Sequence, residues 1–592
     1  MRRTLSLALV LVLAACRSAA PAEPEGLASL LDRARAEVDA GAALDALVTL
    51  DDALALAPQS LAAWQLRAEA LLEASTARGD ANFLEDSLAA WQRALELGAG
   101  PPALFGASRS ARGVLKGDLA LDFARRGLAA QPQPSATELR IASEACFDAY
   151  IARRQAGEVA PELFAESEAL LLRALEAAPK DPWPPVQLAN LYQWEGRNDG
   201  ALELLARAVE LDPANEPLHA RLAALMRSLE GPESVASFYA SLCARLPDAA
   251  LPHWFAAQEL FELAVPTLAT DPGAGARFER AEAFYRRCRE LEPSYASACT
   301  GFEVMCRAGA GWTRFHAGEL DAAERLFRSM EELFPGGLEW RLEGRVRSGV
   351  EGLQFVADRW LRGAADSLGG FEVGAASKAA RIYAFLHAYR PADADFANNA
   401  GFFHREWGVG LVTSSREHRA LAAAATDPAV HDLELALAER TFAQARDVLA
   451  TCRDAYLAAA SLAPQDVRVT NDAALILVYH FPSRVAEAER LLLAAVEAGA
   501  RQKDSGELPA QALDLLIEAW GDAHQNLGVL ELVHRRNPAR AREWFAKTVA
   551  IGPQPRVGRE WVTQVALPAC DALFQGQDIA PEDLDPRIAL LE

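Results

Sequence analysis

The sequence contains ten histidines, which are candidates for metal binding and catalysis because imidazole is a common metal ligand and acid–base group. They are scattered, with no His-x-His and no two histidines four residues apart, so no helix face carries paired zinc ligands. The glycines within 369–370 and 408–410 lack the lysine and spacing of a phosphate loop, and no Gly-x-Ser-x-Gly segment offers a nucleophilic serine. The sequence therefore predicts no catalytic residue, no metal and no cofactor, and a protein that is not an enzyme.

One segment leaves an alternative open. Carboxylates are numerous, but on amphipathic helices a run of charges usually faces solvent, so no catalytic pair can be chosen from them. Residues 336–440 could instead hold the active site of an enzyme or enzyme subunit, although an aromatic core with surface histidines explains the same residues. The aromatic and imidazole side chains concerned are Trp360, His387, His404, Trp407 and His418.

The N-terminus carries an export signal. Arg2 and Arg3 precede a short apolar run over 5–13, which is too short to span a bilayer, since spanning needs roughly 20 residues. The run ends in Leu13-Ala14-Ala15-Cys16, which resembles the lipobox of bacterial lipoproteins. That resemblance implies a signal peptide over 1–15, lipidation of Cys16, and a lipid-anchored protein of the cell envelope, on the outer membrane and facing the periplasm.

Composition restricts the partners and the fold. The formal net charge of -23 repels phosphate backbones, and no basic stripe with interleaved aromatics offsets it, so nucleic acid is excluded as a partner. Residues 16–26 are rich in Ala, Pro and Glu without hydrophobic periodicity, which predicts a flexible tether. The rest is rich in alanine and leucine and poor in β-branched residues, so we expect an all-α chain.

The cysteines beyond Cys16 do not form a disulfide framework, because their number is odd and they are widely spread. Cys299 and Cys306 share a helix face, but about 10 Å of helical rise separates them. The spacing leaves open a bridge from Cys288 to either one, and otherwise predicts small core residues. The seven are Cys146, Cys243, Cys288, Cys299, Cys306, Cys452 and Cys570.

A repeated pattern of side-chain sizes runs along the chain. A small residue is followed four positions later by a large apolar one, three later by a small one, and five later by proline, as in Ala201, Leu205, Ala208 and Pro213. Small residues let two helices approach, the large residue fills the space between them, and proline ends the helix. Other copies begin at Ala46, Ser167, Ala281, Ala323, Cys452 and Ala541.

The prolines at 179, 213 and 247 are 34 residues apart, which is the tetratricopeptide period. In the copy from Pro182 to Asn215, Leu188, Ala189 and Tyr192 stand where that family has its large, small and aromatic residues, with Gly196 at the turn. The chain thus resembles a tetratricopeptide repeat protein. The resemblance implies an all-α solenoid of helix hairpins in a right-handed superhelix.

The pattern also predicts the domain organisation. Regular repeats are expected over 27–335 and again, with a terminal cap, over 441–592. Between them, over 336–440, the pattern lapses while helical spacing continues, so an irregular helical segment is expected. Asn398 to Phe402 resemble the start of a repeat whose second helix is delayed to about Phe442.

The resemblance implies a scaffold or adaptor that binds protein or peptide partners of the envelope, with no small-molecule substrate. Lysines that clamp a peptide's terminal carboxylate in such repeats would stand at Val186 and Pro217, so that mode of binding is not expected. An extended segment is expected instead, held by amide and aromatic side chains. The predicted partner-binding residues are Trp183, Asn190, Gln193, Trp194 and Arg221.

Overall fold

The computed structural model describes residues 26–363, 372–551 and 558–591, and within them all regular structure is helical apart from one isolated bridge between Leu342 and Val346. The predicted all-α fold is therefore confirmed. The chain forms two compact units, Met1–Ala256 and Ala257–Glu592, whose division falls within helix α14 (Ala250–Ala264). The predicted signal peptide, Cys16 and nearly all of the tether lie outside the described residues.

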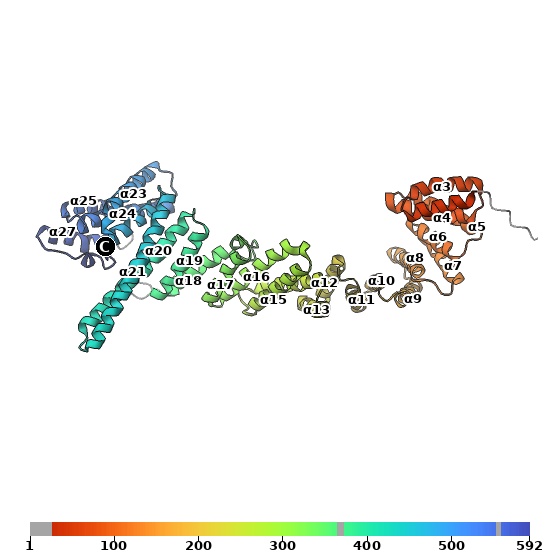
Figure 1. The fold of residues 1–592 in the computed structure, drawn as a ribbon, viewed down its shortest axis with the longest axis horizontal. Helices are drawn as coiled ribbons and strands as arrows, with labels where there is room; N and C mark the ends of the chain where they lie inside the picture. The colour runs from red at the N-terminus through yellow and green to blue at the C-terminus, as the bar shows by residue number, and fades with distance from the viewer. Residues whose placement is uncertain (1–25, 364–371, 552–557, 592) are drawn as a thin grey trace, which may run out of the picture. The chain divides into compact units, whose positions relative to one another are not determined.

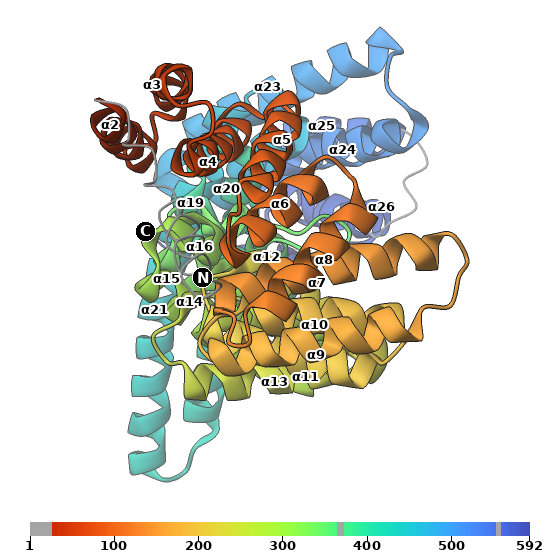
Figure 2. The ribbon, with the colours of Figure 1, turned by 90° about the vertical axis from the view of Figure 1, so that its right-hand side faces the viewer.

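The first unit is a stack of antiparallel helix pairs (Figures 1 and 2). Its helices are α2 (Leu27–Asp39), α3 (Ala43–Leu56), α4 (Leu61–Arg78), α5 (Asn82–Glu96), α6 (Pro101–Gly113), α7 (Gly117–Ala130), α8 (Ala136–Gln155), α9 (Pro161–Ala177), α10 (Trp183–Trp194), α11 (Asn198–Leu211), α12 (Glu216–Glu230) and α13 (Pro232–Arg245). Each packs on the next in sequence, and α2, α4, α6 and α8, the first helices of their pairs, also touch in succession. This is how a solenoid buries its core.

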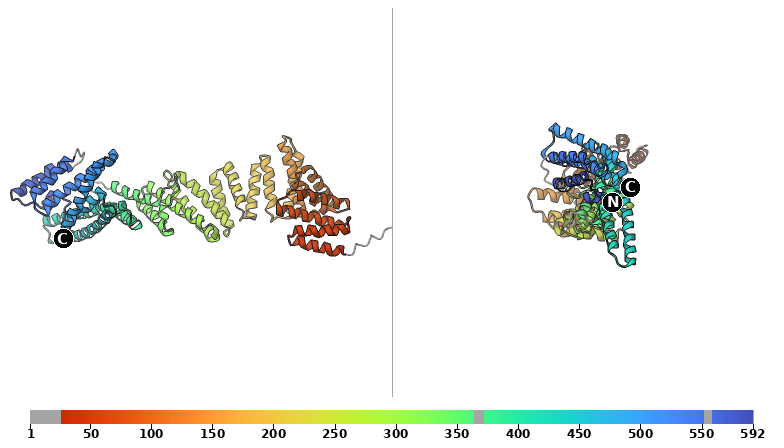
Figure 3. Two further views of the ribbon diagram at one scale, coloured as in Figure 1. Left: turned by 90° about the horizontal axis from the view of Figure 1, so that it is seen from above. Right: turned by 90° about the vertical axis from the view of Figure 1, so that its left-hand side faces the viewer.

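The second unit continues with helix pairs of more variable length (Figure 3). Its main helices are α15 (Gly273–Leu291), α16 (Ala296–His316), α17 (Leu320–Leu333), α18 (Gly349–Gly363), α19 (Val373–Tyr389), α20 (Ala394–Ala424), α21 (Pro428–Leu462), α22 (Val467–His480), α23 (Val485–Ser505), α24 (Ala510–Val533) and α25 (Pro538–Ala550). Consecutive helices again pack together, and α22 touches both α20 and α24.

The predicted small, large, small pattern lies in the second helices and is buried. In α11, Ala201, Leu205 and Ala208 are fully buried, and α11 ends two residues before Pro213. Burial imposes these sizes, because the large side chain must fill the space that its small neighbours leave open. The same holds for Ala46, Leu50 and Ala53 in α3, for Ala281, Tyr285 and Cys288 in α15, and for Ala323, Phe327 and Met330 in α17. The helix pairs are thus of the tetratricopeptide type.

Glycines allow the tightest points of this packing. Gly196, at the predicted turn between α10 and α11, has a φ of 72°, a conformation that side chains with a Cβ rarely adopt. Farther along, Phe327 of α17 lies between Gly311 of α16 and Gly352 of α18. A Cβ on Gly311 or Gly352 would lie 2.6 or 2.5 Å from a ring carbon of Phe327, so the ring packs directly against helix backbone at both positions and leaves no room for a side chain there.

The segment predicted to be irregular, 336–440, begins with a short 3₁₀ turn (Gly337–Glu339), followed by α18, α19, α20 and the start of α21. The prediction that the second helix of its last pair is delayed to about Phe442 is wrong, because α21 begins at Pro428. The extra residues lengthen both helices, whose joined ends project from the neighbouring helices as a two-helix arm (Figures 1 and 2). The predicted limit at residue 440 lies inside α21; the division into domains stays a prediction.

The predicted terminal stretch forms α26 (Gly558–Trp561), a π-helical turn (Val562–Ala566) and α27 (Leu567–Phe574), of which α27 packs on α25. A short helix, α28 (Pro581–Leu584), follows. The residues after α28 then contact α20 and α22. No pattern in the sequence predicts these contacts. Within the described ranges, every helix is too short or too polar to span a bilayer.

All seven cysteines after Cys16 are buried and none is in a disulfide, so the predicted core role is confirmed and Cys288 is not bridged to Cys299 or Cys306. Burial disfavours the charged thiolate. It raises the pKa of Cys146 and Cys243 to about 12 and that of Cys570 to about 11. These thiols are therefore poor nucleophiles in the folded chain.

Candidate functional site

The candidate site lies in the first unit, where α10 and α12 begin. Pro184 and Pro185 occupy the first turn of α10, where a missing N–H costs nothing. Asn215 caps α12, since its Oδ1 accepts a hydrogen bond from the Leu218 N–H at 3.2 Å. These local choices fix where both helices start.

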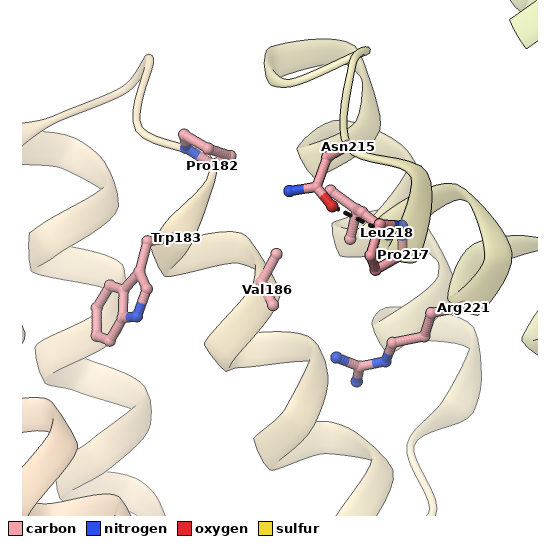
Figure 4. Close-up of a pocket in the computed structure, with 7 residues that line it drawn as sticks. All are labelled: Pro182, Trp183, Val186, Asn215, Pro217, Leu218 and Arg221. Carbon is pink, nitrogen blue, oxygen red and sulfur yellow. Dashed lines mark hydrogen bonds between the residues drawn. The ribbon is translucent and has the colours of Figure 1, made fainter. Parts of the chain in front are cut away.

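Between the two helix starts is an open hollow of about 390 Å³ (Figure 4). Its walls are mainly aromatic and aliphatic, and the Arg221 guanidinium points toward Val186 across the gap. Such a surface, apolar with few polar groups, is typical of sites that bind a ligand. The lining residues are Pro182, Trp183, Val186, Asn215, Pro217, Leu218 and Arg221.

Arg221 supplies the charge in this hollow. Its Nη2 donates a hydrogen bond to Oε1 of Gln193 on α10, which links the two helices. Burial lowers the pKa of Arg221, because it removes water from the charged guanidinium. No carboxylate in the described part of the chain forms an ion pair with it. Most of its five N–H donors are thus left for an acceptor from outside.

Trp183 has a divided role. It lines the hollow, but the guanidinium of Arg140 on α8 lies 4.7 Å from the centroid of its ring. Trp183 also packs against the apolar cluster that contains Tyr150 and Leu188. The indole therefore joins neighbouring repeats and offers only part of its surface to a ligand.

The remaining predicted residues are arranged differently. Gln193 joins the site through Arg221, whereas Asn190 and Trp194 are not among the residues that line the hollow. Asn190 donates from Nδ2 to Oε1 of Gln187 at 3.0 Å, and Trp194 is 47% exposed at the end of α10. Trp194 stands about 16 Å of helical rise beyond Trp183, so both cannot line one small hollow. A binding role for these residues stays a prediction.

The other residues that line the hollow are not among the predicted partner-binding residues. Pro217 and Leu218 lie one 34-residue period after Trp183 and Pro184, so repeat arithmetic could have located them. The sequence can identify Asn215 as the cap at the start of a helix, but it does not indicate that this residue also borders a hollow.

A second hollow in the same unit, of about 580 Å³, lies along α7, α8 and the start of α9. Its arginines are already paired: Arg125 with Glu166 at 2.6 Å, and Arg153 with Glu158 at 3.2 Å. Paired charges leave less to offer a ligand, so the hollow at α10 and α12 is the better candidate.

The aromatic and histidine side chains of 336–440 make contacts within helix pairs. Lys378 Nζ lies 3.7 Å from the centroid of the Trp360 ring, and His404 donates from Nδ1 to the Ala400 carbonyl at 2.7 Å. His418 Nδ1 is 2.6 Å from Glu434 Oε2. Over the described ranges no group of three or more His, Cys, Asp or Glu side chains could hold a metal ion.

No family model matches the chain, and no curated protein does. Solved structures do match. YrrB, described as a TPR protein with an unusual peptide-binding site, has 16% identity and a TM-score of 0.26, covering 32% of this chain and 90% of its own. The C-terminal part of a TPR repeat-containing protein from Cytophaga hutchinsonii has 10% identity and a TM-score of 0.30, covering 55% and 99%.

The TPR domain of P58(IPK) has 16% identity and a TM-score of 0.18, covering 64% of this chain and 98% of its own. Three features of this chain's own structure define its fold: the period of 34 residues, the buried small and large residues of the second helices, and the contacts between successive first helices. By that geometry the chain is an all-α solenoid of tetratricopeptide-like helix hairpins.

Proposed function

We propose that this chain is a non-enzymatic scaffold that holds an extended segment of a partner protein in the hollow between α10 and α12. The observation that carries the proposal is Arg221, a half-buried cation with no carboxylate partner in the described chain, in an otherwise apolar hollow. A ligand that brings an oxygen acceptor beside an apolar side chain satisfies both features.

The acceptor is a backbone carbonyl or an acidic side chain of the partner. A clamp for a terminal carboxylate needs further cations, and the positions expected to supply them hold Val186 and Pro217. In this arrangement Arg221 orients the segment, while Trp183, Val186 and Leu218 cover an apolar side chain of the partner.

We also propose that the scaffold is lipid-anchored in the bacterial envelope, on the outer membrane and facing the periplasm. The support is the segment Leu13 to Cys16 directly after the apolar run of a signal peptide. The tether over 16–26 would hold the helix pairs away from the lipid, so its partners would be envelope proteins.

A photo-crosslinking amino acid at Val186, in the full chain expressed in its native membrane fraction, tests the binding proposal. We expect a discrete adduct with a partner protein, identified by mass spectrometry. A crosslinker at Glu203, exposed on α11, is the matched control and should not give that adduct.

Arg221→Ala should then lower the yield of the Val186 adduct about tenfold or more. A hydrogen bond to a charged group contributes about 1.5–3 kcal/mol, and 1.4 kcal/mol is a factor of ten. Arg207→Ala, which removes an exposed arginine from α11, should leave the yield unchanged. An equal yield from Val186 and Glu203, or one that does not depend on Arg221, would place the binding surface elsewhere.

A further inference from the structure

The segment after α28 lies across the first helices of two pairs in the second unit. Residues 585–591 form no helix or strand, yet Asp585, Ile588 and Ala589 are buried, with Ile588 only 1% exposed. Pro586 and Leu590 face solvent. The segment is thus a surface strap that turns over 585–588, where the Ile588 N–H donates to the Asp585 carbonyl at 2.9 Å, and it is anchored by its three buried side chains.

Arg416 of α20 holds the backbone of this strap. Its Nη1 donates to the carbonyl of Pro586, and its Nη2 donates to the carbonyl of Ile588 at 2.9 Å. One guanidinium thereby binds two main-chain acceptors two residues apart. Bonds of this kind recognise the path of the backbone, here a turn over 585–588, whatever its exposed side chains are.

The end of α22 binds the next part of the strap. The Ala589 N–H donates to the Tyr479 carbonyl at 3.2 Å, and the Leu591 N–H donates to the His480 carbonyl at 3.1 Å. Nδ1 of His480 in turn donates to the Ala589 carbonyl at 3.0 Å. The last carbonyls of a helix lack intrahelical partners, so α22 offers acceptors to any extended chain at this place.

Side chains add specificity. The Tyr479 hydroxyl donates to Oδ2 of Asp585 at 3.2 Å, and Arg587 bonds the same carboxylate at 2.6 Å while lying 5.7 Å from the Tyr479 ring centroid. Ile588 and Ala589 belong to the apolar core that α20 and α22 share. The site thus accepts an acidic residue, then an aliphatic and a small residue three and four positions later.

We propose that Arg416, Tyr479 and His480 form a second peptide-binding site, occupied here by residues 585–591 as an internal ligand that a partner protein's segment of the same chemistry and backbone turn displaces. Five hydrogen bonds from α20 and α22 go to the main chain of the strap, and a segment in trans can make the same bonds. The site lies wholly in the second unit and does not depend on the hollow at α10 and α12.

The full chain carrying Ile588→Asp tests the proposal. A carboxylate cannot be buried at this position without a partner, so the strap should leave its site. The probe is a fluorescein-labelled peptide with the wild-type sequence of residues 581–591, followed by fluorescence anisotropy. We expect this variant to keep its helical circular dichroism and to bind the peptide at least about tenfold more tightly than the wild-type chain, whose own strap competes.

Adding Arg416→Ala to Ile588→Asp should weaken peptide binding about tenfold or more, whereas adding Arg419→Ala, an exposed arginine of the same helix, should not. Three results would overturn the proposal: loss of the second unit's helices in Ile588→Asp, a folded variant that binds no peptide, or binding that does not depend on Arg416. The first would make the strap an integral part of the fold instead of a ligand.

Discussion

Substitution of Gly311 by alanine tests the helix packing most directly. Phe327 is fully buried between Gly311 and Gly352, and a Cβ at 311 would lie 2.6 Å from its Cε1. Ordinary contact begins at 3.4 Å. The ring would have to move by about 0.8 Å to regain such contact, and Gly352 limits movement on its other side.

The magnitude follows from two opposing terms. Overpacking of this kind costs about 1–3 kcal/mol, whereas replacing glycine by alanine inside a helix gains about 1 kcal/mol. Because the ring is enclosed on both sides, we expect the upper part of the first range. Gly311→Ala should therefore lower the free energy of unfolding of this region by about 1–2 kcal/mol.

Gly275→Ala is the matched control. Gly275 is also buried in a helix of the second unit, but its Cβ would meet Thr313 Cγ2 at 3.6 Å, an ordinary contact. This variant should be as stable as wild type, or more stable by up to about 1 kcal/mol.

Urea denaturation followed by circular dichroism, with hydrogen exchange of α16 and α17, would measure both variants, since a solenoid can open locally. Phe327→Leu combined with Gly311→Ala should cost less than the sum of the single changes, because the smaller side chain makes room for the methyl group. Equal stability of Gly311→Ala and Gly275→Ala would show that Phe327 can move aside without cost.

Three further predictions follow from other parts of the chain. Cys16→Ser should accumulate as unprocessed precursor, and mass spectrometry of the wild-type protein should show a lipid-modified N-terminus at Cys16; an unmodified mature N-terminus elsewhere contradicts this. Cys146, Cys243 and Cys570 should resist alkylation at pH 8 in the folded protein and react in urea, because burial raises the pKa of each thiol; rapid labelling of the native chain contradicts their burial. Burial lowers the pKa of His480 from 6.5 to about 4. Arg405 and Arg416 also lower this pKa, whereas Asp585 raises it. The unfolded chain therefore binds more protons than the folded chain as the pH falls from 6.5 to 4. The contribution of His480 to the free energy of unfolding is thus complete above pH 6.5 and decreases toward pH 4 by up to about 3 kcal/mol. His480→Asn, which keeps a hydrogen-bond donor, should remove this part of the pH dependence. An identical pH profile in the variant would contradict the prediction.

The parts of the fold that could be predicted from sequence are those where burial dictates size. The side-chain sizes of Ala201, Leu205 and Ala208 predict that these residues are buried between helices, and Pro213 predicts the end of the helix. Gly196 likewise predicts the turn between α10 and α11, because few other residues adopt its backbone conformation.

Other parts have no such local signal. The arm of α20 and α21 is largely exposed, so helix formers extend it without a size rule to mark its length. In the candidate site, the repeat geometry places Trp183 and Arg221 on the groove side of two successive first helices, but spacing along α10 does not show that Arg140 covers part of the indole. The strap over 585–591 escaped notice because its contacts join residues more than a hundred positions apart.

That separation has a consequence for biosynthesis. Arg416 precedes the carbonyl of Ile588 by 172 residues, and His480 precedes that of Ala589 by 109. A ribosome adds about 5–20 residues each second, so α20 and α22 leave the exit tunnel several seconds before the segment that covers them. During that interval Arg416 and the end of α22 lack the main-chain partners that residues 585–591 later supply.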